Sequence, residues 1–174
     1  MLVGFMAAGK STVGRLLADR LGWEFLDFDG AILERTGRTA GEIIREDGEA
    51  AFRALEAELT HALAGRSRVV IAPGGGWGAD PDNARRLGSD TTSVWLRIPV
   101  EEALRRAERD GRRGIERPLL DGAGEADRLR RARGLLAKRE RAYAAAELAV
   151  DVNGKEPEAI VDEILKGLGR KDDG

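Results

Sequence analysis

Residues 4–11 have the sequence Gly-Phe-Met-Ala-Ala-Gly-Lys-Ser and match the pattern G-x-x-x-x-G-K-[ST] in full. They lie between a short apolar run and an amphipathic helical pattern, which is the setting that this motif requires. In such a loop, backbone N–H groups surround phosphate oxygens, and the N-terminus of the following helix adds positive potential. The motif therefore predicts a nucleotide phosphate-binding loop; the alternative is a glycine-rich turn that only caps a helix.

Two side chains of this motif have predicted roles of their own. Lys10 places a positive charge on the β- and γ-phosphates of a nucleotide, and the hydroxyl of Ser11 can ligate Mg²⁺. We therefore expect ATP as the phosphoryl donor, Mg²⁺ as the metal cofactor and Lys10 as a catalytic residue. The residues expected to contact the nucleotide are Ala7, Ala8, Gly9, Lys10, Ser11 and Thr12.

Two carboxylates follow a second apolar run, the predicted strand Glu24–Phe28. Alternation along a strand would place Asp27 and Asp29 on the same face. One of them could hold Mg²⁺, which binds few carboxylates and several waters, and the other could accept the proton of an attacking hydroxyl. The alternative is that one of the pair caps the next helix, with Asp29 before Gly30 as the candidate.

The third apolar run, the predicted strand Arg68–Ala72, ends at Pro73 and Gly74–Gly76 without a carboxylate. Many P-loop enzymes have at such a strand end the Asp that helps to hold Mg²⁺. The acidic ligand must therefore come from elsewhere, and Asp27 is the leading candidate. Trp77 follows the glycines, and the sequence leaves open whether it lies in the core or in the wall of a substrate pocket.

Apolar and helical patterns alternate along the rest of the chain. Strands are predicted at residues 2–5, 24–28, 68–72, 93–98 and 148–152. Helices are predicted at residues 11–21, 31–36, 39–47, 49–64, 101–109, 125–145 and 157–168. This alternation predicts an α/β sandwich around a mostly parallel sheet, in which helices connect the strands and ligands bind at the carboxyl ends of the strands.

The composition is typical of one compact domain spanning residues 1–174. The formal net charge is −2, so no overall field favours nucleic acid, and no apolar run approaches the roughly 20 residues of a membrane span. The chain has no cysteine, which excludes disulfides and thiolate metal sites, and no secretory signal pattern. We expect a cytoplasmic monomer without nucleic-acid or membrane partners, and a disordered tail at about 169–174.

With these motifs, the chain resembles the shikimate kinases from Leu2 to about Leu168. The matching residues are Gly4 to Gly14, Asp27 to Asp29, Phe52, Arg53, Gly74 to Gly76, Arg117 to Leu120, Lys138, Arg139 and Tyr143. The resemblance implies the fold of the nucleoside monophosphate kinases, a three-layer sandwich with a five-stranded parallel sheet and a mobile lid at about 112–124. It also implies transfer of the γ-phosphoryl group of ATP to the 3-hydroxyl of shikimate, a step of aromatic amino-acid (chorismate) biosynthesis.

The resemblance also implies which residues bind the acceptor. Asp29 would contact the hydroxyls of shikimate and act as the base, Arg53 and Arg139 would grip its carboxylate, and Gly75 and Gly76 would contact it through the backbone. Charge-assisted hydrogen bonds from a guanidinium to a carboxylate contribute about 1.5–3 kcal/mol each, and Arg suits such forked contacts better than Lys. Without the resemblance, both arginines would be interpreted as solvated helix residues.

On the nucleotide side, the resemblance implies that Asp27 is linked to Mg²⁺ and that Arg117 of the lid reaches the ATP phosphates as a catalytic residue. Ala7 stands where the family usually has a glycine, and we expect an alanine there to be tolerated only with a negative φ. Two other functions stay open. One is a P-loop kinase for another small hydroxy acid or polyol such as gluconate; the other is a nucleotide-binding regulatory module without catalysis.

Overall fold

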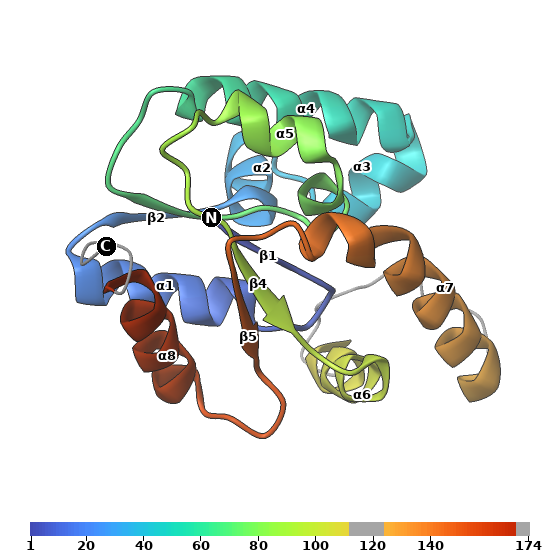
Figure 1. The fold of residues 1–174 in the computed structure, drawn as a ribbon. Coiled ribbons are helices and arrows are strands. Elements are labelled where there is room, and N and C mark those ends of the chain that lie inside the picture. The colour runs from blue at the N-terminus through green and yellow to red at the C-terminus, as the bar shows by residue number, and fades with distance from the viewer. Residues whose placement is uncertain (112–123, 170–174) are drawn as a thin grey trace.

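The structure, a computed structural model, describes residues 1–111 and 124–169 (Figure 1). Its strands are β1 (Leu2–Gly4), β2 (Glu24–Asp27), β3 (Val69–Ala72), β4 (Val94–Arg97) and β5 (Leu148–Asp151). Its helices are α1 (Lys10–Leu21), α2 (Phe28–Thr36), α3 (Ala40–Asp47), α4 (Glu49–Leu63), α5 (Pro81–Arg86), α6 (Val100–Gly111), α7 (Glu125–Tyr143) and α8 (Pro157–Gly169), with a 3₁₀ turn η1 (Trp77–Ala79). The predicted lid at 112–124 and tail at 169–174 lie outside the described residues, apart from Gly124 and Gly169.

All the strand pairs in these ranges are parallel, as predicted. β4 pairs with β1 on one side and with β5 on the other, while β2 pairs with β3. The hydrogen-bonded ladders therefore form a three-stranded and a two-stranded sheet, in place of the single five-stranded sheet that the resemblance implies. β1 lies beside β3, but β1 has only three residues and turns away at Gly4, whose φ is 149°, which leaves little extended backbone for a second ladder.

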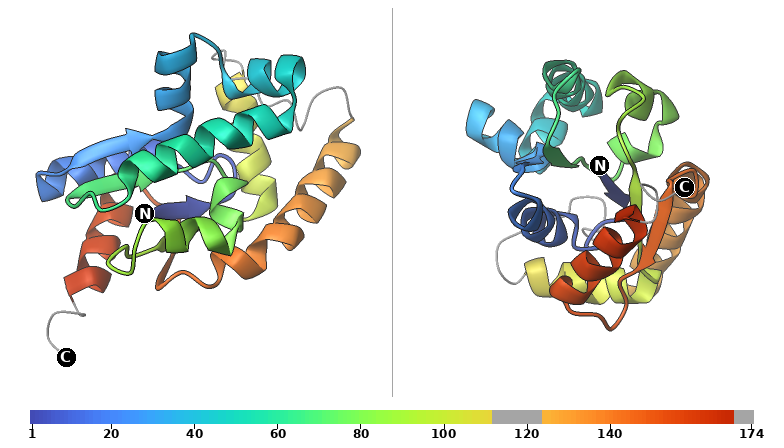
Figure 2. Two further views of the ribbon diagram at one scale, coloured as in Figure 1. Left: turned by 90° about the horizontal axis from the view of Figure 1, so that it is seen from above. Right: turned by 60° about the vertical axis from the view of Figure 1, so that its left-hand side comes forward.

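Helices cover both faces of the strands. Helices α2 to α5 lie above the strands in the view of Figure 1, and α1, α6 and α8 lie below them. The view from above in Figure 2 shows α4 and α5 over the strands and α7 at the edge of the molecule. This is the layered α/β arrangement predicted from the alternation of strands and helices. In the described part of the chain, no helix combines the length and the apolar character needed to cross a membrane.

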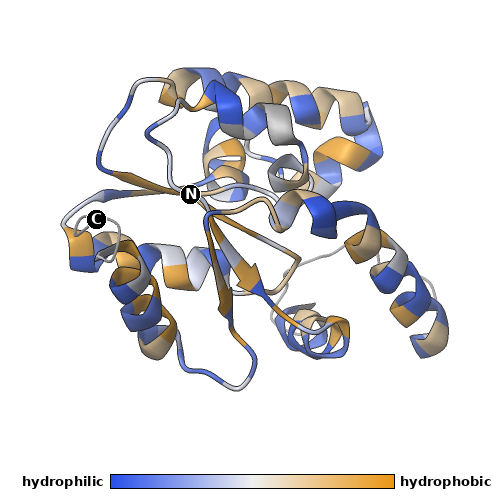
Figure 3. Ribbon diagram, in the orientation of Figure 1, coloured by the Kyte–Doolittle hydropathy of each residue, from blue (hydrophilic) through white to orange (hydrophobic). Residues whose placement is uncertain are grey.

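The largest hydrophobic core lies between the strands and the lower helices, and Figure 3 shows the strands β4 and β5 as largely hydrophobic, while hydrophobic and hydrophilic residues alternate along the helices. Its fully buried side chains include Leu2, Val13, Leu17, Val94, Leu96, Val150, Ile160 and Ile164. A second cluster on the upper side contains Phe28, Leu63, Ile71, Trp77 and Leu87. Trp77 is only 1% exposed, so of the two alternatives for this residue the structure supports the core.

The substitution Gly14→Ala tests how closely α1 packs on the strands. A methyl group at Gly14 would lie 2.5 Å from Cε2 of Phe25 and 3.2 Å from Cδ1 of Leu2. Alanine normally stabilises a helix relative to glycine, but overpacking in a core costs more. We expect the free energy of unfolding, measured by urea denaturation, to fall by about 1–3 kcal/mol.

The matched control is Gly134→Ala in α7, where a methyl group would meet no heavy atom within 4 Å. There we expect only the higher helix propensity of alanine to act, and the free energy of unfolding to rise by about 0.5–1 kcal/mol. If both variants were stabilised, the close approach of α1 to Phe25 would be wrong.

Candidate active site

The predicted phosphate-binding loop connects β1 to α1. Gly4 ends the strand, Gly9 is the N-cap of α1 with a φ of 90°, and no side-chain hydrogen bond caps the helix there. The backbone N–H groups of a first helical turn have no partners inside the helix, and the helix dipole adds positive potential at this end. The loop and the start of α1 therefore offer an anion-binding site of the kind that the motif predicts.

Lys10 folds back over this loop. Its Nζ donates hydrogen bonds to the carbonyl oxygens of Gly4 at 3.0 Å and Phe5 at 3.2 Å, which places the ammonium group beside the loop backbone. Ser11 and Thr12 follow in the first turn of α1, and both side chains are exposed. The structure thus brings together the predicted phosphate-binding lysine and the predicted metal-binding hydroxyl at one helix N-terminus.

Ala7 differs from its expectation. Its φ is 55°, in the left-handed region, so the expectation of a negative φ is wrong. The loop has to turn sharply between β1 and α1, and the two ends of the turn are fixed by the core residues on either side. A left-handed conformation costs a non-glycine residue about 1–2 kcal/mol. The loop therefore retains its shape with alanine, at the expense of local backbone strain.

The acidic pair also differs from its expectation. β2 ends at Asp27 and α2 begins at Phe28, so Asp29 lies on the first turn of a helix and the two carboxylates do not alternate along one strand. Asp27 is the N-cap: its Oδ1 accepts hydrogen bonds from the N–H groups of Asp29 at 3.0 Å and Gly30 at 3.4 Å. The expected cap, Asp29, was therefore the wrong one of the two. A cap carboxylate satisfies orphan helix N–H groups, which explains why the strand stops here.

The sequence predicts Ser11 and Asp27 as ligands of a magnesium ion that is held together with a nucleotide, and each keeps an oxygen that could serve. Oδ2 of Asp27 takes no part in the helix cap, and the hydroxyl of Ser11 is exposed. The described residues contain no cluster of three or more His, Cys, Asp or Glu side chains that could hold a metal by themselves. Mg²⁺ commonly uses one or two protein ligands and completes its shell with phosphate oxygens and water.

Arg53 on α4 and Arg139 on α7 converge on the glycines after β3. A methyl group at Gly76 would overlap the guanidinium of Arg53, with Cζ and Nη1 at 2.9 Å. A methyl group at the neighbouring Gly75 would lie 3.3 Å from Nη1 of Arg139. Two guanidinium groups that are far apart in the sequence thus lie over adjacent residues without side chains. Any other residue than glycine at position 76 would displace the guanidinium of Arg53.

Glu56 is a site residue that the sequence analysis missed. Its side chain is 1% exposed, its Oε2 accepts a hydrogen bond from Arg53, and its Oε1 has no partner among the described residues. Burial raises the pKa of the Glu56 carboxyl, against the opposing effect of Arg53. A signal was present in the sequence, because Glu56 lies four residues from both Phe52 and Thr60, on the helix face that also carries the buried Leu63.

Asp29 belongs to the same cluster. Its Oδ1 lies 3.8 Å from the position that a methyl group would occupy on Gly74, and Oε1 of Glu56 lies 2.9 Å from that position. The charge of Asp29 also raises the pKa of Glu56. The predicted base and the predicted carboxylate-binding arginine therefore meet at the glycine run, although their side chains come from α2 and α4.

Trp77 anchors the glycine run to α4. Its Nε1 donates a hydrogen bond to Oγ1 of Thr60 at 2.7 Å, and that hydroxyl donates to the carbonyl of Glu56 at 2.7 Å. The indole also packs edge-on against Phe28, with ring centroids 5.4 Å apart. Phe28 lies between Asp27 and Asp29 in the sequence. A buried indole with its N–H satisfied holds a loop firmly, because leaving that group unpaired would be costly.

One predicted site residue, Arg117, falls outside the described residues, so its predicted place at the ATP phosphates stays a prediction.

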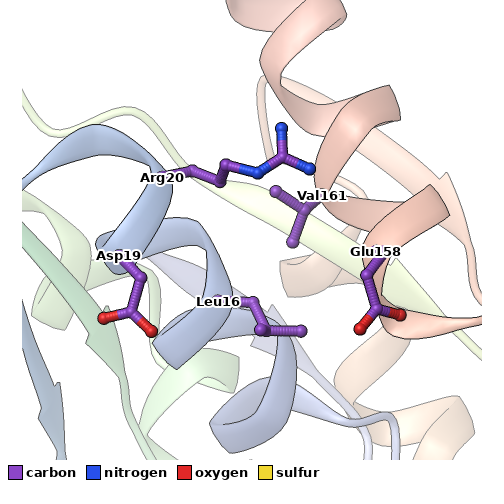
Figure 4. Close-up of a pocket in the computed structure, with 5 residues that line it drawn as sticks. All are labelled: Leu16, Asp19, Arg20, Glu158 and Val161. Carbon is purple, nitrogen blue, oxygen red and sulfur yellow. The ribbon is translucent and has the colours of Figure 1, made fainter.

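A cavity of about 200 Å³ lies between the C-terminal half of α1 and α8 (Figure 4). Its lining residues are Leu16, Asp19, Arg20, Glu158 and Val161, none of which is a predicted site residue. This cavity is separate from the loop and the glycine run.

Comparison with known proteins gives a consistent family. The family model described as shikimate kinase matches residues 6–169 of this chain. A shikimate kinase of Persephonella marina is 40% identical over 164 residues, which cover 94% of this chain and 94% of the relative. A shikimate kinase of Moorella thermoacetica is 42% identical over 168 residues, covering 97% of this chain and 92% of the relative.

Solved structures agree with these relatives. A shikimate kinase from Acinetobacter baumannii in complex with shikimate has a TM-score of 0.88 and 35% identity, with coverage of 99% of this chain and 93% of that one. A gluconokinase from Sinorhizobium meliloti has a TM-score of 0.66 and 20% identity, with coverage of 97% and 90%. At that identity the second likeness concerns the fold alone.

Ala7→Gly tests the strain in the phosphate-binding loop. Glycine removes the cost of the left-handed conformation, although it adds about 0.4–1 kcal/mol of entropy to the unfolded chain. We expect a net rise of about 0.5–1 kcal/mol in the free energy of unfolding, measured by denaturant titration. The control is Ala8→Gly, at a neighbour that is 1% exposed and has no positive φ. Ala8→Gly should lower stability by about 1 kcal/mol, and equal effects at both positions would contradict the strain.

Proposed function

This chain belongs to the shikimate kinase family, and on that premise we propose that it transfers the γ-phosphoryl group of ATP to the 3-hydroxyl of shikimate. The observation that carries this proposal is the convergence of Arg53 and Arg139 over Gly75 and Gly76. Two guanidinium forks over exposed backbone form a binding site for a planar anion, and the acceptor contributes one carboxylate. Asp29, which lies near Gly74 and Glu56, supplies a group for the reacting hydroxyl.

On the acceptor side, Arg53 and Arg139 hold the carboxylate and thereby fix the orientation of the ring. The backbone of Gly75 and Gly76 can approach the acceptor closely because neither residue has a side chain. Asp29 accepts the proton of the attacking hydroxyl and orients its oxygen toward the donor. Glu56 is buried against Arg53 and fixes the direction of that guanidinium, so it supports binding without taking part in the reaction.

On the donor side, residues 7–12 bind the phosphates of ATP through the backbone and the start of α1. Lys10 exchanges its hydrogen bonds with the carbonyls of Gly4 and Phe5 for contacts with phosphate oxygens. Ser11 and Asp27 hold Mg²⁺, which supplies charge neutralisation at the β- and γ-phosphates when it is bound. Arg117, from the segment outside the described residues, completes the positive charge around the transferred group.

The reaction is an in-line displacement at the γ-phosphorus. The acceptor oxygen forms a bond to phosphorus, the bond to the bridging oxygen of ADP breaks, and the hydroxyl proton passes to Asp29. Such transfers are accelerated mainly by positioning and by stabilisation of charge on the phosphoryl oxygens. This proposal includes the cytoplasmic, monomeric state expected from the sequence.

The reaction is tested by a coupled assay of ADP release over a panel of acceptors with shikimate, gluconate and a carboxylate-free shikimate analogue. We expect shikimate to give the highest kcat/KM, and Lys10→Ala to reduce kcat by at least about 10²–10³-fold because a charge at the transferred group is lost. Lys166→Ala, an exposed lysine on α8, serves as the control and should leave the rate unchanged. A higher kcat/KM with gluconate would replace the acceptor named here, and ATP binding without turnover would favour a regulatory module.

Arg139→Ala tests the grip on the carboxylate. We expect the KM for shikimate to rise about 10–100-fold, since each charge-assisted hydrogen bond contributes about 1.5–3 kcal/mol, while the KM for ATP stays constant. Arg141→Ala is the matched control, because Arg141 is exposed two residues further along the same helix. An Arg139→Ala enzyme with the parent's KM for shikimate would remove this part of the proposal.

A further inference from the structure

Tyr143 is the last residue of α7 and is fully buried. Its hydroxyl donates a hydrogen bond to the carbonyl oxygen of Gly75 at 2.7 Å. Its ring lies beside Trp95, with ring centroids 6.2 Å apart, and its Cε1 approaches Gly78. The side chain therefore attaches the end of α7 directly to the glycine run of the site.

This attachment is important because few other side chains of α7 are fully buried among the described residues. Ala132 and Tyr143 are its fully buried residues, and the leucines of the helix are only partly buried. Its ion pairs with α6, such as Arg133 with Glu101 at 2.6 Å, join side chains that are 62% and 54% exposed. Exposed ion pairs contribute little to stability. At the C-terminal end of α7, the contact of Tyr143 with Gly75 thus fixes how the helix faces the site.

Arg139 lies one turn before Tyr143, and residues four apart share a helix face. A methyl group at Gly75 would lie 3.3 Å from both Nη1 of Arg139 and the hydroxyl oxygen of Tyr143, so the two polar groups meet over the same glycine. Burial raises the pKa of the Tyr143 phenol, and the charge of Arg139 and a side-chain hydrogen bond from it oppose that rise. The phenol thus connects the guanidinium to the carbonyl of Gly75.

We propose that Tyr143 is a positioning residue for the acceptor carboxylate, because its hydroxyl fixes both the guanidinium of Arg139 and the peptide between Gly75 and Gly76. A trans peptide is planar, so a carbonyl of Gly75 held by Tyr143 also sets the direction of the N–H of Gly76. The inference rests on the proposed function, in which Arg139 grips the carboxylate. It assigns to Tyr143 an effect on the acceptor and none on ATP.

Tyr143→Phe removes the hydroxyl and keeps the ring beside Trp95. We expect the KM for shikimate to rise about three- to tenfold, while the KM for ATP changes less than twofold. With the carboxylate-free analogue, the variant and the parent should have the same KM. A rise that is equal for ATP and shikimate, or equal for shikimate and the analogue, would overturn the proposal, because it indicates a general loss of structure.

A double-mutant cycle separates this inference from the function on which it rests. If Tyr143 acts chiefly through Arg139, adding Tyr143→Phe to Arg139→Ala raises the KM for shikimate by less than it does in the parent, whereas adding it to Arg53→Ala keeps the full three- to tenfold factor. A normal KM for Arg139→Ala alone would remove the proposed carboxylate grip. An impaired Arg139→Ala together with a normal Tyr143→Phe would overturn only the positioning role.

A second measurement avoids the substitution in case Tyr143→Phe does not fold. The chain has a single tyrosine, so incorporation of 3-fluorotyrosine gives one ¹⁹F resonance, from position 143. We expect shikimate to shift this resonance and the carboxylate-free analogue to leave it in place. A resonance that shikimate does not move, in a protein that still phosphorylates shikimate, would overturn the proposal.

Discussion

The site depends on the close approach of two guanidinium groups to a stretch of backbone that carries no side chains. Arg53 lies over Gly76 and Arg139 lies over Gly75, and a methyl group at either glycine would contact the arginine above it. Each of these guanidinium groups also has a second side chain beside it. The buried carboxylate of Glu56 compensates Arg53, and the phenol of Tyr143 lies beside Arg139.

The glycine run is held from both sides by the helices that carry the arginines. From α4, Thr60 accepts the indole N–H of Trp77, and from α7, Tyr143 donates to the carbonyl of Gly75. Each arginine and the glycine beneath it are thus attached to the same helix, so a shift of that helix moves the arginine and the glycine together. This explains how two separate helices can keep the geometry of one small site.

The sequence predicted the features that depend on local pattern. The strand–loop–helix setting of the residue 4–11 motif, the parallel strands and the place of most helices follow from a motif and from apolar periodicity, and they are confirmed. Features that depend on tertiary contacts were missed or wrong: the positive φ of Ala7, the cap at Asp27 and the burial of Glu56. The short elements η1 and α5 have too few residues for a periodic pattern and were also missed.

The surroundings of Arg53 have a consequence for how the acceptor enters. Arg53 contacts two carboxylates, Glu56, which is 1% exposed, and Glu49 at 2.8 Å, which is 68% exposed. An incoming anion can displace the solvated partner far more readily than the buried one. Binding of an anion at Arg53 is then an exchange of ion-pair partners, in which the carboxylate of Glu49 returns to solvent as the carboxylate of the acceptor takes its place. Because one attraction replaces another, the proposed binding of the acceptor carboxylate at Arg53 would gain less net attraction than binding at a guanidinium without a carboxylate partner.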